Sequence, residues 1–508
     1  MPQYLLGIDN GNTVCKATLF DQKGRVIYSV STKVKTYYPQ IGWSERNIDE
    51  LWQANVKNIK SIIHKSGINP LEIAGIGNTG HGNGLYLLDK SGKPVVGIQS
   101  IDTRAGNLVE EWQAHGLQRQ VYPLTQQQFW ASQTNTLLAW FKLNKPKVYD
   151  NIGAVLLCKD LINYLLTQEI ATDFSDISVT NLFNIHTKKY DDDLIDIYKL
   201  KDIRAALPPV FQSHEIIGKI TKKVAKQTGL AEGTPVIAGM LDVDASMIGS
   251  GIIKSGEMAI VAGTWSVNAL LSEKTTTNPN ITMTALFAKP NQYLTLEASA
   301  TSITNLEWFI NQFCADERRK AKRMGISIHE VCDELVRQTD KNLPMLFHPF
   351  LHGSNVQSNA RAGFYGLGGW NTKADMMRAI YEGIVFGHLN HIKRLRESGE
   401  VNIKTIRITG GGSRSPVLSQ MFADVLNVPV EVPNTTETGT WGVAIAAGIA
   451  MGIFKNYEEA IEETVSVGKT YFPKLDSHNI FNQKYQIFQN LINQMEMTWN
   501  SLNQINIS

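Results

Sequence analysis

The chain has 508 residues, of which 43% are hydrophobic and 19% charged, so it can form two or three domains with sizeable cores. This composition excludes an intrinsically disordered protein and a single small domain. Lys and Arg number 49 against 47 Asp and Glu, and the formal net charge of +2 gives no reason to expect a nucleic-acid partner.

Cysteine usage and hydropathy indicate the compartment. The four cysteines lie far apart and form no CxxC motif, which argues against a zinc site and a dense disulfide scaffold. The N-terminus lacks the basic start and apolar stretch of a secretory signal, and the longest small and apolar run, 442–454, is too short to span a bilayer. We therefore expect a cytoplasmic protein without a membrane partner, and a packed helix over 442–454.

The first part of the chain predicts an α/β domain. Strands are expected over 4–9, 14–20 and 25–34, separated by turns rich in Asn, Asp and Gly. Apolar residues at helical spacing then predict a helix over 51–66, and 73–77 predicts another strand. Alternation of strands and helices is typical of an α/β fold.

A second strand, turn and strand over 258–271 repeats the pattern of the first pair. This repeat predicts two domains with related α/β cores. An apolar strand over 235–240 leads to Asp242, and a domain boundary is expected soon after it. The predicted domains are therefore 1–245 and 246–508.

The turn after the first strand combines residue types that suit the phosphates of a Mg²⁺-bound nucleotide. Asp9 is a carboxylate at a strand end, Gly11 permits a tight turn, and Lys16 is a cation in the next strand. Asn12 and Thr13 add amide and hydroxyl donors. The alternative is a hairpin turn without a ligand, which the Asp-Asn-Gly composition also favours.

Two further glycine turns strengthen the nucleotide interpretation. Gly263 and Thr264 stand in the equivalent position of the second strand pair. A strand over 405–408 runs into a glycine-rich turn before a helical pattern, and such a turn is typical of phosphate or nucleotide sites. The residues of that turn are Gly410, Gly411, Gly412 and Ser415.

Two other nucleotide motifs are incomplete. Residues 75–80 match GxGxxG, but 85–89 reads as a strand, whereas a dinucleotide site needs a helix next. The near-Walker segment 468–470 lacks the required glycine five places earlier, where Glu463 stands. An NAD-dependent oxidoreductase is therefore only a distant alternative.

Polar side chains at the ends of apolar strands are candidate substrate ligands. A carboxylate at the end of a strand in an α/β core could act as a base toward a hydroxyl group, and Asp242 fits this better than Asp244, which reads as a helix cap. His81, Asp102 and Arg104 could hydrogen-bond sugar hydroxyls. The residues alone favour the alternatives without a ligand, in which His81 is a loop histidine hydrogen-bonded within the protein and Asp102 and Arg104 form a local ion pair.

Taken together, these residues resemble the FGGY carbohydrate kinases nearly from end to end. The most specific match is Ala362-Gly363-Phe364-Tyr365-Gly366-Leu367 followed, after the family's spacer, by 375–382, which fits the family's C-terminal signature. The resemblance implies an α/β fold of two actin-like ATPase (ribonuclease H-like) domains with an interdomain cleft. It also implies sugar binding by the first domain and ATP binding by the second.

The resemblance assigns roles to single residues. Asp242 falls on the family's catalytic base, and Asp9 is the expected Mg²⁺ ligand. The expected sugar-binding residues, besides Asp242, are His81, Gly82, Asp102 and Arg104. The expected ATP-binding residues are Gly11, Asn12, Thr13, Lys16, Gly263, Thr264, Gly410, Gly411, Gly412 and Ser415.

Within the family, the chain is most similar to the L-xylulose kinases, for example at 42–46 and 437–439. Leu137 replaces the lysine that is common in the N-terminal family signature. His81 and Asn83 stand where L-xylulose kinases carry Gln and Lys, and His-Gly is similar to D-xylulose kinases instead. The departure at Leu137 should leave ATP chemistry intact, whereas that at His81 and Asn83 leaves the choice of sugar open.

The sequence thus predicts an ATP-dependent kinase, with Mg²⁺ as cofactor, that phosphorylates a terminal hydroxyl of a ketose, with a pentulose such as L-xylulose preferred. D-xylulose, 3-keto-gulonate and a polyol such as erythritol are the alternative substrates. An actin-like regulatory ATPase is the alternative from another class, because a fold alone does not imply kinase activity. The oligomeric state, a homodimer included, is left open.

Overall fold

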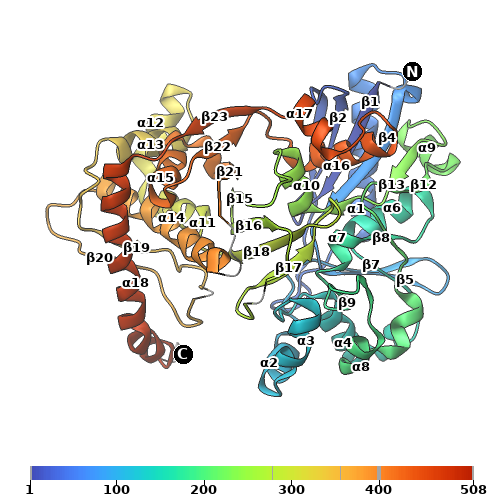
Figure 1. The fold of residues 1–508 in the computed structure, drawn as a ribbon, viewed down its shortest axis with the longest axis horizontal. Coiled ribbons are helices and arrows are strands. Elements are labelled where there is room, and N and C mark those ends of the chain that lie inside the picture. The colour runs from blue at the N-terminus through green and yellow to red at the C-terminus, as the bar shows by residue number, and fades with distance from the viewer. Residues whose placement is uncertain (1–2, 277, 355, 398–401, 506–508) are drawn as a thin grey trace. The chain divides into compact units, whose positions relative to one another are not determined.

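The structure is a computed structural model that describes residues 3–276, 278–354, 356–397 and 402–505. The chain divides into two compact units, each assembled from three segments (Figure 1). Unit 1 consists of Met1–Ser255, Leu271–Thr295 and Glu437–Ser466. Unit 2 consists of Gly256–Leu270, Leu296–Thr436 and Val467–Ser508.

The main sheet of unit 1 has the strand order β12-β13-β4-β1-β2-β3, and β14 also pairs with β4. The neighbours β1 and β2 are antiparallel, as are β2 and β3, whereas β4 runs parallel to β1. These strands are β1 (Tyr4–Asn10), β2 (Val14–Asp21), β3 (Val26–Lys33), β4 (Ile73–Gly80), β12 (Ile216–Lys219), β13 (Pro235–Ile237) and β14 (Met240–Leu241). The predicted strand pattern at the N-terminus is therefore confirmed.

The strand expected over 235–240 is broken in the structure. It consists of β13 and β14, separated by Gly239 at φ +77°. A methyl group added to Gly239 would lie 1.9 Å from the backbone oxygen of Asn78. The chain can therefore bend here only because position 239 carries no side chain.

Helix α1 (Ile48–Ser66) starts three residues before its predicted start because Asn47 caps it. The Asn47 side chain accepts a hydrogen bond from the Glu50 amide at 3.0 Å, and Gly67 ends the helix at φ 69°. The apolar face of α1 packs into the core beneath β1, β2 and β4, with Leu51, Ile59 and Ile62 fully buried. The spacing of these apolar residues predicted this burial correctly.

Helix α16 (Thr438–Ala450) covers the same sheet and packs closely against α10 (Asp242–Gly249). A methyl group on Gly442 would lie 1.8 Å from the Ala245 oxygen, and one on Gly249 would lie 1.9 Å from the Thr438 oxygen. The expected packed helix over 442–454 exists, but it begins four residues earlier. The two helix backbones approach each other at glycines that leave no room for a side chain.

The remaining elements of unit 1 form a smaller sheet, short strand pairs and further helices around these cores. The strands are β5 (Leu85–Asp89), β6 (Pro94–Ile98), β7 (Ile152–Leu156), β8 (Thr172–Asp173), β9 (Phe183–Asn184), β10 (Lys189–Tyr190), β11 (Val210–Phe211) and β17 (Met283–Leu286). The helices are α2 (Gly106–Ala114), α3 (Leu117–Thr125), α4 (Thr134–Asn144), α5 (Pro146–Tyr149), α6 (Cys158–Thr167), α7 (Phe174–Ile177), α8 (Asp192–Ile197), α9 (Lys222–Thr228) and α17 (Tyr457–Thr464).

A second sheet has the strand order β17-β18-β16-β15-β21-β22-β23, and every one of these strands except β17 belongs wholly or partly to unit 2. The strands are β15 (Glu257–Ala262), β16 (Ser266–Ser272), β18 (Tyr293–Ser299), β21 (Thr405–Thr409), β22 (Val430–Pro433) and β23 (Val467–Tyr471), with a separate pair β19 (Leu346–His348) and β20 (Gly363–Tyr365). The helices are α11 (Ile303–Phe313), α12 (Ala315–Met324), α13 (Ile328–Arg337), α14 (Lys373–Glu397), α15 (Pro416–Leu426) and α18 (Leu475–Asn503).

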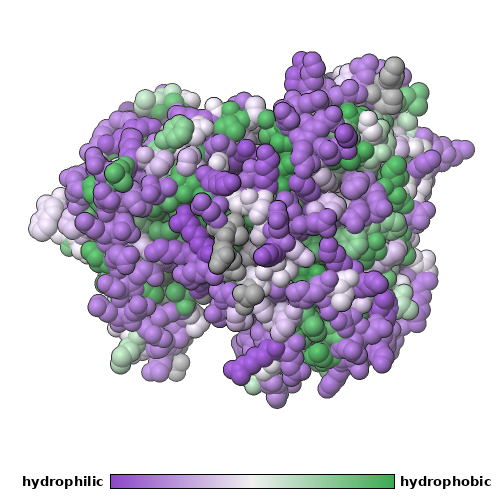
Figure 2. Space-filling view, in the orientation of Figure 1, coloured by the Kyte–Doolittle hydropathy of each residue, from purple (hydrophilic) through white to green (hydrophobic). Residues whose placement is uncertain are grey.

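The two sheets repeat one pattern. In each, an antiparallel hairpin, β1 with β2 or β15 with β16, is followed across the sheet by a parallel strand, β4 or β21. The predicted repeat of an α/β core is therefore confirmed. Among the described residues no helix is long and apolar enough to cross a membrane, and the face drawn in Figure 2 carries mainly hydrophilic side chains.

Candidate active site

In unit 1, the predicted phosphate turn joins β1 to β2. Asp9 lies opposite Lys16 in the strand register, and the Gly11 amide closes the turn by donating to the Val14 oxygen at 3.1 Å. Burial raises the pKa of the Asp9 carboxyl to about 6, with Lys16 lowering it and Glu437 raising it. Thr13 is exposed, and Gly11 and Asn12 are half-buried. The five predicted residues of this turn therefore lie together.

Side chains from other parts of unit 1 donate hydrogen bonds to the carbonyl oxygens of this turn. The Arg46 guanidinium donates to the Gly11 oxygen at 3.3 Å and also to the Asn12 oxygen. Gln99 donates to the Asn12 oxygen at 2.6 Å, and the Asn12 side chain donates to the Ser100 hydroxyl at 2.9 Å. Arg46 is almost fully buried, so these contacts give the turn a defined shape.

Asp242 follows β14 directly and is the first residue of α10. Burial, with a smaller contribution from the negative charge of Asp9, raises the pKa of its carboxyl to about 7. A carboxyl with this pKa exchanges its proton near neutral pH, as a general base must. Asp9 and Asp242 thus belong to one electrostatic site.

Asp244 has a different environment. Its carboxylate accepts a hydrogen bond from the Ala288 amide at 2.7 Å, and the residue is fully buried. Helix α10 has no side-chain cap, so the interpretation of Asp244 as its cap is wrong. The carboxyl of Asp244 anchors the segment around Ala288 instead.

The N-terminus of α16 belongs to this site, although the sequence analysis assigned no role to it. The Glu437 carboxylate lies 3.1 Å from the Lys16 ammonium, and the Thr438 hydroxyl lies 3.0 Å from that of Ser246 on α10. A methyl group on Gly439 would lie 3.2 Å from Asp9 Oδ2. The signal was present, because 437–439 carried part of the family resemblance, but nothing in the sequence linked it to Asp9.

His81 and Gly82 lie beside the segment that carries Asp242. His81 Nε2 is 3.0 Å from the Tyr86 hydroxyl, and burial, followed by the charge of Arg46, lowers the pKa of His81 to about 3. A methyl group on Gly82 would lie 2.4 Å from Leu241 Cδ1. His81 is therefore neutral at physiological pH. The residue after it, Gly82, lies against Leu241, which directly precedes Asp242.

Asp102 and Arg104 bond mainly to each other and to nearby protein groups. Asp102 accepts from the Ser44 amide at 2.6 Å and from Arg104 at 2.9 Å. Arg104 also pairs with Glu45 at 2.8 Å and lies 4.1 Å from the centre of the Trp43 ring. Both side chains are almost fully buried, and the local ion pair considered above is present.

In unit 2, the two remaining glycine turns lie against each other. Methyl groups on Gly410 and Gly412 would lie 2.9 Å and 3.0 Å from the Ala262 oxygen, and Gly410 has φ +82°. Gly263 accepts from the Ile303 amide at 3.0 Å, while Thr264 and Gly411 are exposed. The predicted ATP-binding residues of this unit are therefore also brought together.

The hydroxyl of Ser415 is engaged within unit 2. It donates to Asp333 Oδ1 at 2.6 Å and accepts from the Leu418 amide at 3.0 Å, which caps α15. Ser415 thus fixes the start of the helix that follows the glycine turn.

Comparisons with known proteins identify the family of the chain. Residues 4–249 match the N-terminal domain of the FGGY family of carbohydrate kinases, and residues 258–451 match its C-terminal domain. The chain is 36% identical over 496 residues to an L-xylulose/3-keto-L-gulonate kinase of Escherichia coli (strain K12), covering 97% of each protein. It is 29% identical over 502 residues to a xylulose kinase of Staphylococcus epidermidis (strain ATCC 12228 / FDA PCI 1200), again covering 97% of each.

A solved structure is similar over the whole chain. The ligand-bound xylulose kinase from Lactobacillus acidophilus superposes with a TM-score of 0.89 at 23% identity, covering 98% of this chain and 99% of that one. This likeness supports the two-domain fold that the resemblance implied. The chain therefore belongs to the FGGY family of carbohydrate kinases, and it is a sugar phosphotransferase with the family's two-domain actin-like ATPase fold and its substrate ATP.

Proposed function

We propose that the enzyme transfers the γ-phosphoryl group of ATP to a terminal hydroxyl of a ketose, with a pentulose such as L-xylulose preferred, and that Asp242 is the general base. The observation that carries this proposal is the position of Asp242 at the end of β14, with a pKa raised to about 7 beside Asp9. A relative at 36% identity is named for L-xylulose and 3-keto-L-gulonate, which supports these sugars over unrelated substrates.

In the proposed reaction, the oxygen of the sugar hydroxyl forms a bond to the γ-phosphorus while Asp242 accepts the hydroxyl proton. The bond between the γ-phosphorus and the bridging oxygen breaks, and ADP leaves. Lys16 and the turn around Asn12 are assigned to the phosphates, and the glycine turns at 263–264 and 410–412 to the rest of ATP. His81, Gly82, Asp102 and Arg104 are assigned to the sugar. The Asp102–Arg104 ion pair would hold both side chains in place.

Mg²⁺ fits the donor set at Asp9. The described residues contain no group of three or more His, Cys, Asp and Glu side chains that could hold a metal ion by themselves. A single carboxylate, completed by phosphate oxygens and water, is the usual protein contribution to Mg²⁺ binding. Asp9 would hold the ion, which supplies positive charge to neutralise the phosphates.

A substrate panel tests the proposal. MgATP turnover is measured across pentuloses, hexuloses, keto-gulonate and polyols, with the phosphorylated product detected by mass. We expect one ketose to give ADP and sugar phosphate in equal amounts, and Asp242→Asn to lower the rates of both together with the same sugar. ATP hydrolysis that no sugar stimulates, with no phosphorylated product, would contradict the proposal and favour a regulatory ATPase.

The pKa of Asp242 predicts the pH dependence. A carboxyl whose pKa is raised to about 7 is protonated below that pH, so it cannot accept a proton there. With MgATP held saturating, Mg²⁺ on Asp9 offsets part of the charge that raises this pKa, so kcat/KM for the sugar should rise with pH with a midpoint above the ordinary value of about 4 for Asp and not above about 7. A rate that stays flat between about pH 5 and about pH 8 would contradict Asp242 as the base.

The proposal includes a cytoplasmic location. All four cysteines are free and buried, which fits a reducing compartment. Cell fractionation with an antibody to the native protein would test this location.

A further inference from the structure

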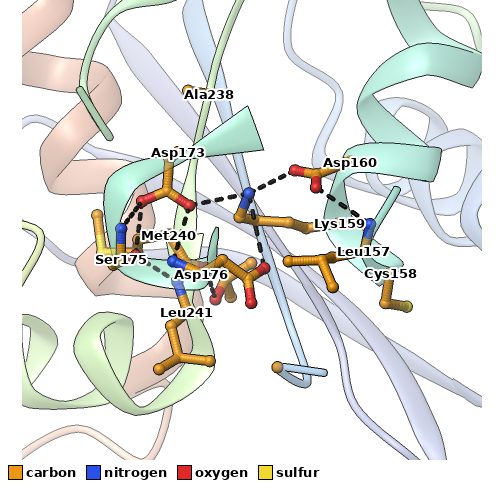
Figure 3. Close-up of polar contacts among 12 residues, drawn as sticks. Leu157, Cys158, Lys159, Asp160, Asp173, Ser175, Asp176, Ala238, Met240 and Leu241 are labelled. Carbon is orange, nitrogen blue, oxygen red and sulfur yellow. Dashed lines mark hydrogen bonds and ion pairs between the residues drawn. The ribbon is translucent and has the colours of Figure 1, made fainter. Parts of the chain in front are cut away.

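A buried charge cluster lies in unit 1 and has no role in the reaction as described so far (Figure 3). Lys159, at the start of α6, lies 2.5 Å from Asp160 and 2.9 Å from Asp173. A third carboxyl, that of Asp176, lies 3.6 Å away, and all four side chains are fully buried. A cluster of this kind is costly to bury, so its position in the fold calls for an explanation.

Asp173 connects the cluster to the start of α7. Its Oδ1 contacts the Lys159 ammonium, while its Oδ2 accepts hydrogen bonds from the Ser175 amide at 2.9 Å and the Ser175 hydroxyl at 2.6 Å. The Ser213 hydroxyl donates to the same oxygen at 2.8 Å. Both oxygens of this carboxylate thus contact donors, which hold it in one orientation.

Ser175 connects Asp173 to β14, the strand that directly precedes Asp242. A hydroxyl has one hydrogen, and Ser175 donates it to Asp173, so its remaining lone pairs can only accept. They accept the hydrogen bond of the Leu241 amide at 3.0 Å (Figure 3). Leu241 is the last residue of β14 and directly precedes Asp242.

The Leu241 amide depends on this contact. Leu241 is almost fully buried, and its neighbour Met240 is fixed separately, because its oxygen accepts from the Thr79 hydroxyl at 2.7 Å. Loss of the Ser175 hydroxyl would leave a buried amide without its acceptor, and the last residue of the strand would shift to find another. The residue that shifts with it is Asp242.

We infer that Ser175 is a positioning residue for the general base, linking the buried Lys159–Asp173 pair to the backbone of Leu241. The inference rests on the proposed role of Asp242 and goes beyond it, since Ser175 is fully buried and its hydroxyl bonds Asp173 and the Leu241 amide. A displacement of about 1 Å at a reacting group can cost on the order of 10²-fold in rate, so a lost hydrogen bond one residue from the base has a measurable effect.

Two serines allow a matched test, because both donate to Asp173 Oδ2 and only one contacts Leu241. We expect Ser175→Ala to lower kcat by about tenfold or more with the KM for MgATP within about twofold of the wild type. The acid limb of the pH profile should move to lower pH, because a loosened Asp242 gains access to water. Ser213→Ala should keep both kcat and the acid limb near the wild type.

The isosteric pair Ser175→Thr and Ser175→Val repeats the comparison at equal side-chain volume, and it serves if the alanine variant does not fold. Thr keeps the hydroxyl and should retain more kcat than Val. Equal losses for Thr and Val, or equal losses for the Ser175 and Ser213 alanine variants, would overturn the inference. Full activity in Asp242→Asn would show that Asp242 is not the base. If Asp242→Asn is inactive but the Ser175 and Ser213 variants lose equal activity, the base assignment stands and only the role of Ser175 is wrong.

Discussion

Replacement of Asp242 by Asn is expected to lower kcat by about 10²- to 10⁴-fold while sugar and ATP still bind, because this is the usual contribution of a general base. Asn keeps the shape and the hydrogen-bonding reach of Asp but cannot accept a proton. The carboxyl it replaces titrates near neutral pH, with a pKa of about 7 that follows from burial and from Asp9. Steady-state kinetics and equilibrium binding of the sugar measure the two effects separately.

Asp244→Asn is the matched control, two residues along the same helix. Burial raises the pKa of the Asp244 carboxyl well above its usual range, and Asn has the same shape as Asp without its charge. The amide oxygen of Asn can still accept from the Ala288 amide, so kcat should stay within about twofold of the wild type. A large loss in Asp244→Asn with full activity in Asp242→Asn would move the base to Asp244.

Replacement of Gly442 by Ala is expected to cost about 3 kcal/mol of stability, which is a large effect for one methyl group. The added carbon would lie 1.8 Å from the Ala245 oxygen, an atom of the α10 backbone that no rotamer change can move. The helices must therefore separate, and the helix that begins at Asp242 moves with them. Thermal denaturation should show a midpoint lowered by about 5 °C or more.

Gly106→Ala is the control for this change. Gly106 is the first residue of α2, and a methyl group added there meets no atom within 4 Å. Its thermal midpoint should be unchanged or slightly higher, since Ala favours helix more than Gly does. A Gly442→Ala variant that melts like the wild type would show that α10 and α16 are not in such close contact.

Local patterns predicted the elements of the fold well, because each rests on residues close together in the chain. The hairpin at Asp9 and the helix over 51–66 follow from turn composition and apolar spacing, and both are present. The break at Gly239 was missed, because it depends on the Asn78 oxygen of another strand, about 160 residues away. The apolar run over 235–240 does not show which backbone atoms of other strands will lie against it.

Site residues could be predicted where the chemistry requires a particular residue type. They could not be predicted where their role depends on contacts with residues far away in the chain. Asp9, Lys16 and Asp242 were identified as candidates, and the structure gathers them in unit 1. Glu437 was not assigned to the site, although it pairs with Lys16, because the two residues are far apart in the chain. For Asp102 and Arg104, the contacts with Ser44 and Glu45 could not be predicted from the sequence, and the role of both residues in sugar binding stays a prediction.

The helix that covers the main sheet of unit 1 comes from the last part of the chain, which has a consequence for synthesis on the ribosome. Methyl groups on Gly7 and Gly77 would lie 2.0 Å and 2.3 Å from backbone oxygens of α16, so this helix sits directly on β1 and β4. Those strands are translated first, and α16 ends only at Ala450. The nascent N-terminal sheet must therefore keep one apolar face uncovered while the first two segments of unit 2 are being made, a period in which chaperones or the ribosome surface have to shield it.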